Sequence, residues 1–329
     1  DLHVHAPQFA FRGLGMDMEL LDWLNTYTFP EESKYRDMEY AQRAYRQFVA
    51  HLRTSATTRV GVFATMHLPA TEFLMQELEN SGLVSYVGKV NMDRNSPDYL
   101  READAKTALE DTERWICETR SAFALWKPIL TPRFIPSCSD ELLRGLGALA
   151  DKYDLPVQSH LSENFGEIAW VRELCPQAAF YGDAYDQFGL FGGKHPCIMA
   201  HCVHSGDEEI ERMRQNGVFV AHSPLSNANL ASGVAPVSKY LDCGLHVGIA
   251  SDVAGGETVD LFRVMADALR DSKLRWRLLD QAVRPLSVDQ VFYLATLGGG
   301  RFFGKVGSFA PGYEFDVVVL DDTTLDHPQ

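Results

Sequence analysis

The chain opens with the stretch DLHVHAPQF, residues 1–9, in which two histidines stand two positions apart. Side chains alternate between the faces of an extended strand, so His3 and His5 point the same way while Val4 points the other way. Two imidazoles on one face can share a metal ion. Because such a pair also arises by chance, its meaning depends on what the rest of the chain places beside it.

Seven further apolar runs follow, and most of them carry a polar side chain of a chemically useful type at or near their end. Near-continuous apolar strands are typical of parallel sheets that are covered on both faces. The eight runs are LHVH (2–5), TTRVGVFATMH (57–67), VSYVGKVNMD (84–93), ALWKPILTPRF (124–134), LPVQSHLSE (155–163), CIMAHCVH (197–204), GVFVAHSP (217–224) and HVGIASD (246–252).

Segments with helical periodicity separate these runs, several of them opened by Ser, Asp or Asn and closed by Gly or a charged residue. Eight such alternations over about 250 residues predict an α/β fold, a (β/α)₈ TIM-like barrel with its active site at the carboxyl ends of the strands. The clearest helical segments are 37–54, 98–118, 139–154, 164–175, 206–217 and 259–271.

We expect the barrel to occupy residues 1–304 and a small β subdomain to include 305–329. The stretch VGSFAPGYEFDVVVLDD, residues 306–322, predicts a turn and a final strand. A lone strand needs partners. Since LHV is already mid-strand, we expect those partners upstream of Asp1, so that the subdomain is incomplete in this sequence.

Composition excludes several classes of function. With 46% hydrophobic residues in 329, the chain can bury a large core. Its formal charge of -15 disfavours nucleic acid and anionic membrane surfaces as partners. No apolar run reaches the roughly 20 residues of a membrane span. The six cysteines form no CxxC pair, which indicates buried thiols in a reducing, cytoplasmic setting.

The strand ends carry a set of residues that a parallel barrel brings to one rim. Three neutral imidazoles and one carboxylate suit a single zinc or iron ion. We therefore expect His3, His5, His160 and Asp252 to be the metal ligands. The stretch HPCIMAHCVH (195–204) has the wrong spacing for a cysteine-histidine zinc knuckle.

Other side chains on this rim suggest acid-base and binding roles. Glu163 stands three residues after His160, where a carboxylate can take a proton from water and deliver it to a leaving group. His201 follows the sixth run and is expected to contact the substrate or the attacking water. The sequence does not assign roles to His204 or His222.

The order HxH, then HxxE, then His, then Asp resembles the mononuclear-metal deaminases of the amidohydrolase superfamily. Binuclear members of that superfamily use a carboxylated lysine at the end of the fourth strand. Here that end reads TPRF (131–134), and Lys127 lies too early in the run. The resemblance therefore implies one metal ion per chain.

Longer motifs resemble the guanine deaminase family over essentially the whole chain. The resemblance implies that Gln8, Arg133, Phe134 and His201 bind a purine, that Glu163, His201 and Asp252 are catalytic, and that the protein is a homodimer. Water activated by the metal, zinc or less often iron, would attack C2 of guanine and yield xanthine and ammonia. The motifs are HVHAPQF (3–9), LLDWLNTYTFPEE (20–32), GKVNMDRNSPDYL (88–100), TPRF, SHLSEN (159–164), MAHCVH (199–204), SPLSNANLASG (223–233), SDVAGG (251–256) and FYLATLGGG (292–300).

Two alternatives remain open at this point. One is a related aminohydrolase that acts on 8-oxoguanine, a pterin or a triazine with the same metal ligands. The other is a barrel that has lost catalysis and serves as a scaffold, although all four expected ligands and Glu163 are present. Cytidine-type zinc deaminases are excluded, because their HxE and PCxxC motifs do not occur.

Overall fold

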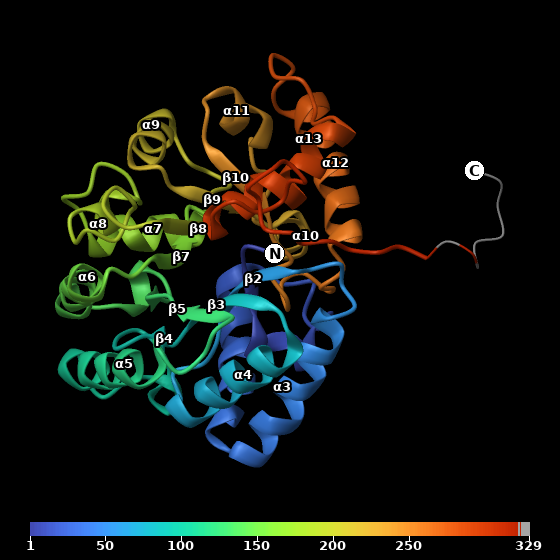
Figure 1. Ribbon diagram of the computed structural model, residues 1–329. Coiled ribbons are helices and arrows are strands. Elements are labelled where there is room, and N and C mark those ends of the chain that lie inside the picture. Colours follow the sequence, from blue (N-terminus) through green and yellow to red (C-terminus); the bar gives the residue numbers. More distant parts are fainter. Residues whose placement is uncertain (322, 324–329) are drawn as a thin grey trace.

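The computed structural model describes residues 1–321 and 323, and its centre is a ring of parallel strands surrounded by helices (Figure 1). Every strand pairing within it is parallel. One sheet has the strand order β1 (Val4–His5), β2 (Arg59–Phe63), β3 (Val84–Gly88) and β5 (Trp126–Pro128). The second sheet has the order β10 (His246–Ile249), β9 (Phe219–His222), β8 (Cys197–His201) and β7 (Val157–Leu161). In a third, short sheet, β4 (Val90–Asn91) pairs with β6 (Thr131–Pro132).

Backbone hydrogen bonds join the two larger sheets at both seams. At one seam, Leu2 N donates to Ile249 O at 3.0 Å. At the other, Leu130 N donates to Pro156 O and Gln158 N donates to Leu130 O, both at 2.9 Å. The ring is therefore closed, and the predicted (β/α)₈ barrel is confirmed.

Helices connect successive strands and cover the outside of the ring (Figure 1). Side-chain caps explain where several of them begin, for example Asp37, whose carboxylate accepts from Glu39 N and Tyr40 N at the start of α3. The helices are α1 (Leu20–Trp23), α2 (Phe29–Ser33), α3 (Met38–Leu52), α4 (Leu68–Ser81), α5 (Ala105–Thr119), α6 (Asp140–Tyr153), α7 (Phe165–Leu174), α8 (Asp183–Asp186), α9 (Asp207–Asn216), α10 (Pro224–Asn229), α11 (Val237–Asp242), α12 (Leu261–Leu278) and α13 (Val288–Tyr293).

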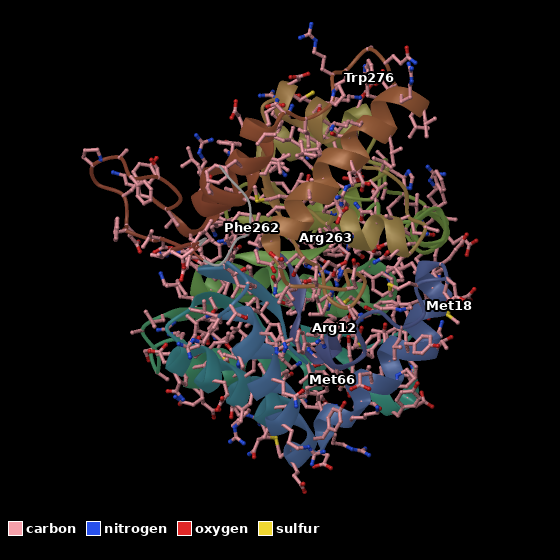
Figure 2. All side chains as sticks on the ribbon, turned by 90° about the vertical axis from the view of Figure 1, so that its right-hand side faces the viewer. Arg12, Met18, Met66, Phe262, Arg263 and Trp276 are labelled. Atoms are coloured by element: carbon pink, nitrogen blue, oxygen red, sulfur yellow. The ribbon has the colours of Figure 1, made fainter. Side chains whose placement is uncertain are left out.

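The chain between β1 and α3 is a long excursion that carries α1 and α2. Figure 2 places Arg12 and Met18 of this excursion on the face that also carries Met66, which follows β2, and Arg263 at the start of α12. All of these positions follow the carboxyl end of a strand. The excursion therefore covers part of the rim on which the sequence predicts the site.

The apolar core has two parts, one inside the ring and one between the ring and its helices. The inner cluster includes Leu2, Ile129, Ile198 and Ala250 and is closed by Phe302, all at most 9% exposed. The larger cluster packs the outer faces of the strands against the helices. A filled interior makes the barrel a rigid support for its rim rather than a pore.

Residues 305–321 carry no assigned strand, and the remainder of the predicted terminal strand lies outside the described residues. Arg59 on β2 ties this segment to the barrel, because its Nε donates to Asp316 Oδ2 at 2.6 Å. The division into a barrel at 1–304 and a subdomain at 305–329 stays a prediction. In the described part of the chain, no helix is both long and apolar enough to cross a membrane.

Gly88 marks a close approach between β3 and β6. A Cβ added there would lie 1.7 Å from Thr131 Oγ1 and 2.7 Å from Thr131 Cβ. Gln158 Nε2, which donates to Thr131 Oγ1 at 2.9 Å, would itself lie 2.8 Å from that Cβ. Only a residue without a side chain fits at this point of the ring.

We expect Gly88→Ala to lower the free energy of unfolding by at least about 1–3 kcal/mol, because overpacking forces neighbours out of position. Chemical denaturation of the single variant, of Thr131→Ala and of the double variant measures this effect. The cost of Gly88→Ala should be smaller in the Thr131→Ala background, where the nearest clashing atom is gone. An equal cost in both backgrounds would contradict the proposed contact.

Candidate active site

Five side chains from four strand ends meet at the carboxyl rim of the barrel. His3 directly precedes β1 and His5 ends it. His160 lies on β7, His201 ends β8, and Asp252 follows β10. Each is buried, except that His160 is partly exposed. Parallel strands bring these positions together although up to 249 residues of sequence separate them, as the number difference between His3 and Asp252 shows.

The four predicted ligands lie within direct contact of one another. His3 Nε2 is 3.0 Å and His5 Nε2 is 3.5 Å from Asp252 Oδ1, and the Nε2 atoms of His5 and His160 are 3.1 Å apart. Burial lowers the pKa of His3, His5 and His160, which favours neutral imidazoles with a free lone pair. Neutral imidazole is the form that binds metals.

The Nε2 atoms of the predicted histidine ligands gather around Asp252, which fits a cation between them. His3 Nε2 has no hydrogen-bond partner. The Nδ1 atom of His160 lies 2.6 Å from the carbonyl oxygen of Arg133 and donates to it. Its Nε2 therefore presents a lone pair to His5. A metal ion placed there would compensate polar atoms that are otherwise costly to bury.

Asp252 supplies the negative charge of the cluster. Burial by itself raises the pKa of a carboxyl group, but the rings of His3 and His201 outweigh burial and hold the pKa of Asp252 well below its usual range. The carboxylate is thus ionised at any physiological pH. A cluster with three neutral imidazoles and one carboxylate leaves a net charge that a divalent cation offsets.

Three of the strand ends have a strained backbone. Ser162, His201 and Asp252 have φ values of 46°, 72° and 45°, in the left-handed region that non-glycine residues avoid. Each such residue costs about 1–3 kcal/mol and persists only where surrounding contacts hold it. Strain of this kind is typical of active sites, because it aims side chains that a regular strand would point elsewhere.

His201 extends the cluster toward Glu163. Its Nε2 lies 3.4 Å from Glu163 Oε2 and 3.6 Å from Asp252 Oδ2, while Nδ1 lies 2.9 Å from Asn227 Oδ1. His3, His160 and His201 also offer ring nitrogens within 4.8 Å of one another, and two ring nitrogens of His3 and His5 lie within the same distance of a carboxylate oxygen of Asp252. His201 is therefore placed both to contact a metal and to move a proton.

Glu163 is buried beside the cluster rather than exposed to solvent. Its side chain is 4% exposed, and Oε1 accepts from Ser232 Oγ at 3.3 Å. Burial, with the nearby charge of Asp252, raises the pKa of Glu163 well above its ordinary value. A carboxylate with a raised pKa is a stronger base than an ordinary one, so it can accept a proton and later return it as a general acid.

The three remaining predicted residues line the same pocket as the cluster. Gln8, Arg133 and Phe134 are each at most 6% exposed. They share the pocket with His5, His160, Glu163, Glu167, His201 and Asp252, and an apolar wall closes it: Leu20, Trp23, Leu24, Leu230 and Gly255. All predicted site residues except His3 thus line one cavity.

Sequence reasoning missed a set of polar residues that hold the predicted ones in place. Asn227 faces His201, Ser232 faces Glu163, and Glu32 binds both Gln8 and Arg133. Glu167 accepts from the backbone N–H of Glu163 at 3.1 Å. Three of the four stand in stretches that resemble the guanine deaminase family, but their side-chain partners are distant in sequence and leave no local pattern.

The two histidines without assigned roles, His204 and His222, have different surroundings. His204 Nε2 lies 2.7 Å from Ser232 O, and its ring stacks on Phe165 with centroids 4.0 Å apart. His222 is buried next to His201, and burial lowers its pKa to about 3, so its ring is neutral. Both contact residues around the site, and neither belongs to the metal-capable groups.

Comparison with known proteins places this geometry in a family. The whole chain, residues 1–329, matches the model of the Amidohydrolase family. The chain belongs to the amidohydrolase family. Metal dependence is typical of this family, in agreement with the clustered histidines and Asp252. The family resemblance inferred from the sequence motifs is confirmed.

Relatives of this amidohydrolase carry a consistent name. A Schizosaccharomyces pombe protein named probable guanine deaminase is 38% identical over 333 residues, covering 99% of this chain and 63% of its own length. Guanine deaminase of Dictyostelium discoideum is 37% identical, covering 100% of this chain and 73% of its own. The chain thus spans less than two thirds of the first relative's length.

A solved structure matches this amidohydrolase across the barrel. The crystal structure of guanine deaminase from C. acetobutylicum, with guanine bound in its active site, superimposes with a TM-score of 0.94 at 52% sequence identity. The match covers 96% of this chain and 75% of the other. The fold assignment and the guanine deaminase resemblance therefore rest on structure as well as on sequence.

We expect His160→Ala to lose most of its bound divalent metal, because it removes a neutral nitrogen from the centre of the donor set. Metal content per chain, measured by mass spectrometry after chelation and reloading, checks this. His246→Ala is the matched control, since His246 stands at the opposite end of β10 from the site. Equal metal content in both variants would contradict the assigned donor set.

Proposed function

We propose that this amidohydrolase is a guanine deaminase, which converts guanine and water to xanthine and ammonia. One observation carries the proposal: a buried arginine and a buried glutamine face the same pocket as a metal-capable cluster and a carboxyl group with a raised pKa. The names of the relatives, and the guanine bound in the C. acetobutylicum structure, support the same reaction.

The purine side of the pocket favours guanine over adenine. Arg133 can only donate hydrogen bonds, so it suits the O6 carbonyl of guanine and rejects the amino group that adenine carries there. Gln8 can both donate and accept along the ring edge. Phe134 supplies an aromatic surface against the base. A polar site of this kind discriminates well, because the wrong ligand leaves a buried donor unpaired.

The metal side of the pocket would hold one zinc ion on His3, His5, His160 and Asp252. Three imidazoles and one carboxylate are an ordinary zinc donor set, and iron is the alternative for the same ligands. When bound, the cation lowers the pKa of a water molecule so that hydroxide is available near neutral pH. Asp252 keeps its negative charge throughout, and His160 is oriented by the carbonyl of Arg133.

Glu163 carries the protons of the reaction. It first accepts a proton from the attacking water, whose oxygen forms a bond to C2 of guanine. It then donates that proton to the amino group on C2, and the C2–N bond breaks as ammonia leaves. Its burial and its contact with His201 place the carboxyl group at the junction of the metal cluster and the purine pocket.

His201 stabilises the oxygen that adds to C2. Because Nδ1 donates to Asn227, the ring is fixed with Nε2 directed at Glu163 and Asp252. In this position a protonated Nε2 would donate to the added oxygen as the ring carbon becomes tetrahedral. Assembly as a homodimer remains a proposal that follows from the family resemblance, and a cytoplasmic setting remains one that follows from the absence of CxxC pairs among the six cysteines.

Full-length protein with one zinc per chain should release ammonia from guanine and not from adenine, and Glu163→Gln should reduce kcat by about 10²–10⁴-fold. A coupled ammonia assay measures both. Glu208→Gln, a change at an exposed position on α9, is the control and should keep full activity. Turnover of 8-oxoguanine, a pterin or a triazine without turnover of guanine would replace this proposal by a related aminohydrolase.

A further inference from the structure

Glu32 binds two residues that line the pocket, Gln8 and Arg133, although it does not line the cavity itself. Its carboxylate is 2% exposed and accepts three hydrogen bonds from two side chains. Arg133 Nη1 donates to Oε2 at 2.6 Å, Arg133 Nη2 donates to Oε1 at 3.1 Å, and Gln8 Nε2 donates to Oε1 at 2.8 Å. The two residues proposed to bind the base therefore share one buried anion.

The helix that carries Glu32 presents a second group to Arg133. Phe29 and Glu32 are three positions apart on α2, so they lie on the same helical face. The guanidinium carbon of Arg133 lies 5.2 Å from the centroid of the Phe29 ring. Arg133 is thus held by a charge at its end and an aromatic ring at its side, and both come from the excursion after β1.

The same contacts connect the purine side to the metal side. Gln8 Oε1 accepts from Ala254 N at 3.2 Å, two residues after Asp252. The carbonyl of Arg133 accepts from His160 Nδ1. Fixing Gln8 and Arg133 with one carboxylate therefore also fixes their distance from the ligands that flank them.

We propose that Glu32 is a positioning residue that determines specificity for the 6-oxo group of the purine. It acts through Arg133 and Gln8 and does not contact the substrate. The inference rests on the proposed guanine deaminase function and deepens it, because it names the group that makes Arg133 a fixed donor. An exposed arginine would sample many rotamers, whereas a bidentate pair holds its plane in one orientation.

The number of donors supports this role. An arginine has five N–H donors, of which Glu32 engages two, so the remaining donors are available to a ligand. Glu32 also neutralises the buried charge of Arg133, which a neutral purine cannot do. Without the carboxylate, the guanidinium would have to turn toward another acceptor in the site.

Glu31 provides a matched control on the same helix. It is also buried, at 7% exposure, but its carboxylate is engaged by Lys34 Nζ at 2.5 Å and by the hydroxyl of Tyr40. Neither partner lines the pocket. Glu31→Gln and Glu32→Gln therefore make the same chemical change at adjacent buried positions, and only one of them disturbs Arg133.

The test compares guanine with 2-aminopurine, which lacks the 6-oxo group. We expect Glu32→Gln to raise KM for guanine by about 10–100-fold, since a hydrogen bond to a charged group is lost, with a smaller change in kcat. Affinity for 2-aminopurine, followed by its own fluorescence, should change by about twofold or less. Glu31→Gln should leave both values and the zinc content as in the wild type.

A double variant identifies the route of the effect. If Glu32 acts through Arg133, then adding Glu32→Gln to Arg133→Lys should cost much less than it costs in the wild type. Glu32→Asp, which keeps the charge but shortens the side chain, should lose guanine preference partly. Glu32→Asp replaces Glu32→Gln in the comparison of the two ligands if Glu32→Gln does not fold, as judged by circular dichroism and zinc content.

Distinct outcomes overturn distinct statements. A zinc-loaded wild type that releases no ammonia from guanine overturns the proposed function and this inference together. The role of Glu32 alone is overturned if the wild type is active and a folded Glu32→Gln or Glu32→Asp variant weakens the binding of guanine and of 2-aminopurine equally. The same conclusion follows if Glu31→Gln changes guanine preference as much as Glu32→Gln does.

Discussion

Burial of charged side chains is the constraint on which this site depends. Asp252, Glu163, Glu32 and Arg133 are each at most 5% exposed, and isolated ions in such surroundings would be very costly. Arg133 and Glu32 compensate each other directly. Asp252 lies 3.0 Å from His3 Nε2 and 3.6 Å from His201 Nε2, where a bound cation would offset its charge. The chemistry and the selectivity both arise from how these charges are matched.

The barrel makes this matching possible because its parallel strands all end on one rim. The ring interior is filled by apolar side chains, so the strand ends have a rigid base. On that base the backbone turns sharply at Ser162, His201 and Asp252, where left-handed residues redirect the chain. The excursion after β1 then brings Glu32 and the apolar wall over the rim. Support, catalytic groups and purine pocket thus come from different layers of one fold.

The sequence predicted the parts of the site that follow from strand periodicity. His3, His5, His160, His201 and Asp252 stand at or beside the ends of apolar runs, and a parallel barrel leaves such positions only one rim to occupy. Glu32 could not be found in this way. It lies on a short helix in a loop, and it meets Arg133 across 101 residues through side-chain geometry that no local pattern encodes. The partners of His201 and Glu163 were missed for the same reason.

The measurement that tests the central claim most directly is a crystal structure of zinc-loaded, full-length Glu163→Gln with guanine, using anomalous scattering at the zinc edge. We expect one anomalous peak among His3, His5, His160 and Asp252, O6 of guanine within hydrogen-bond distance of Arg133, and C2 facing residue 163 and His201. A peak elsewhere, or a purine turned so that its 2-amino group meets Arg133, would contradict the proposed arrangement of metal, proton carrier and base.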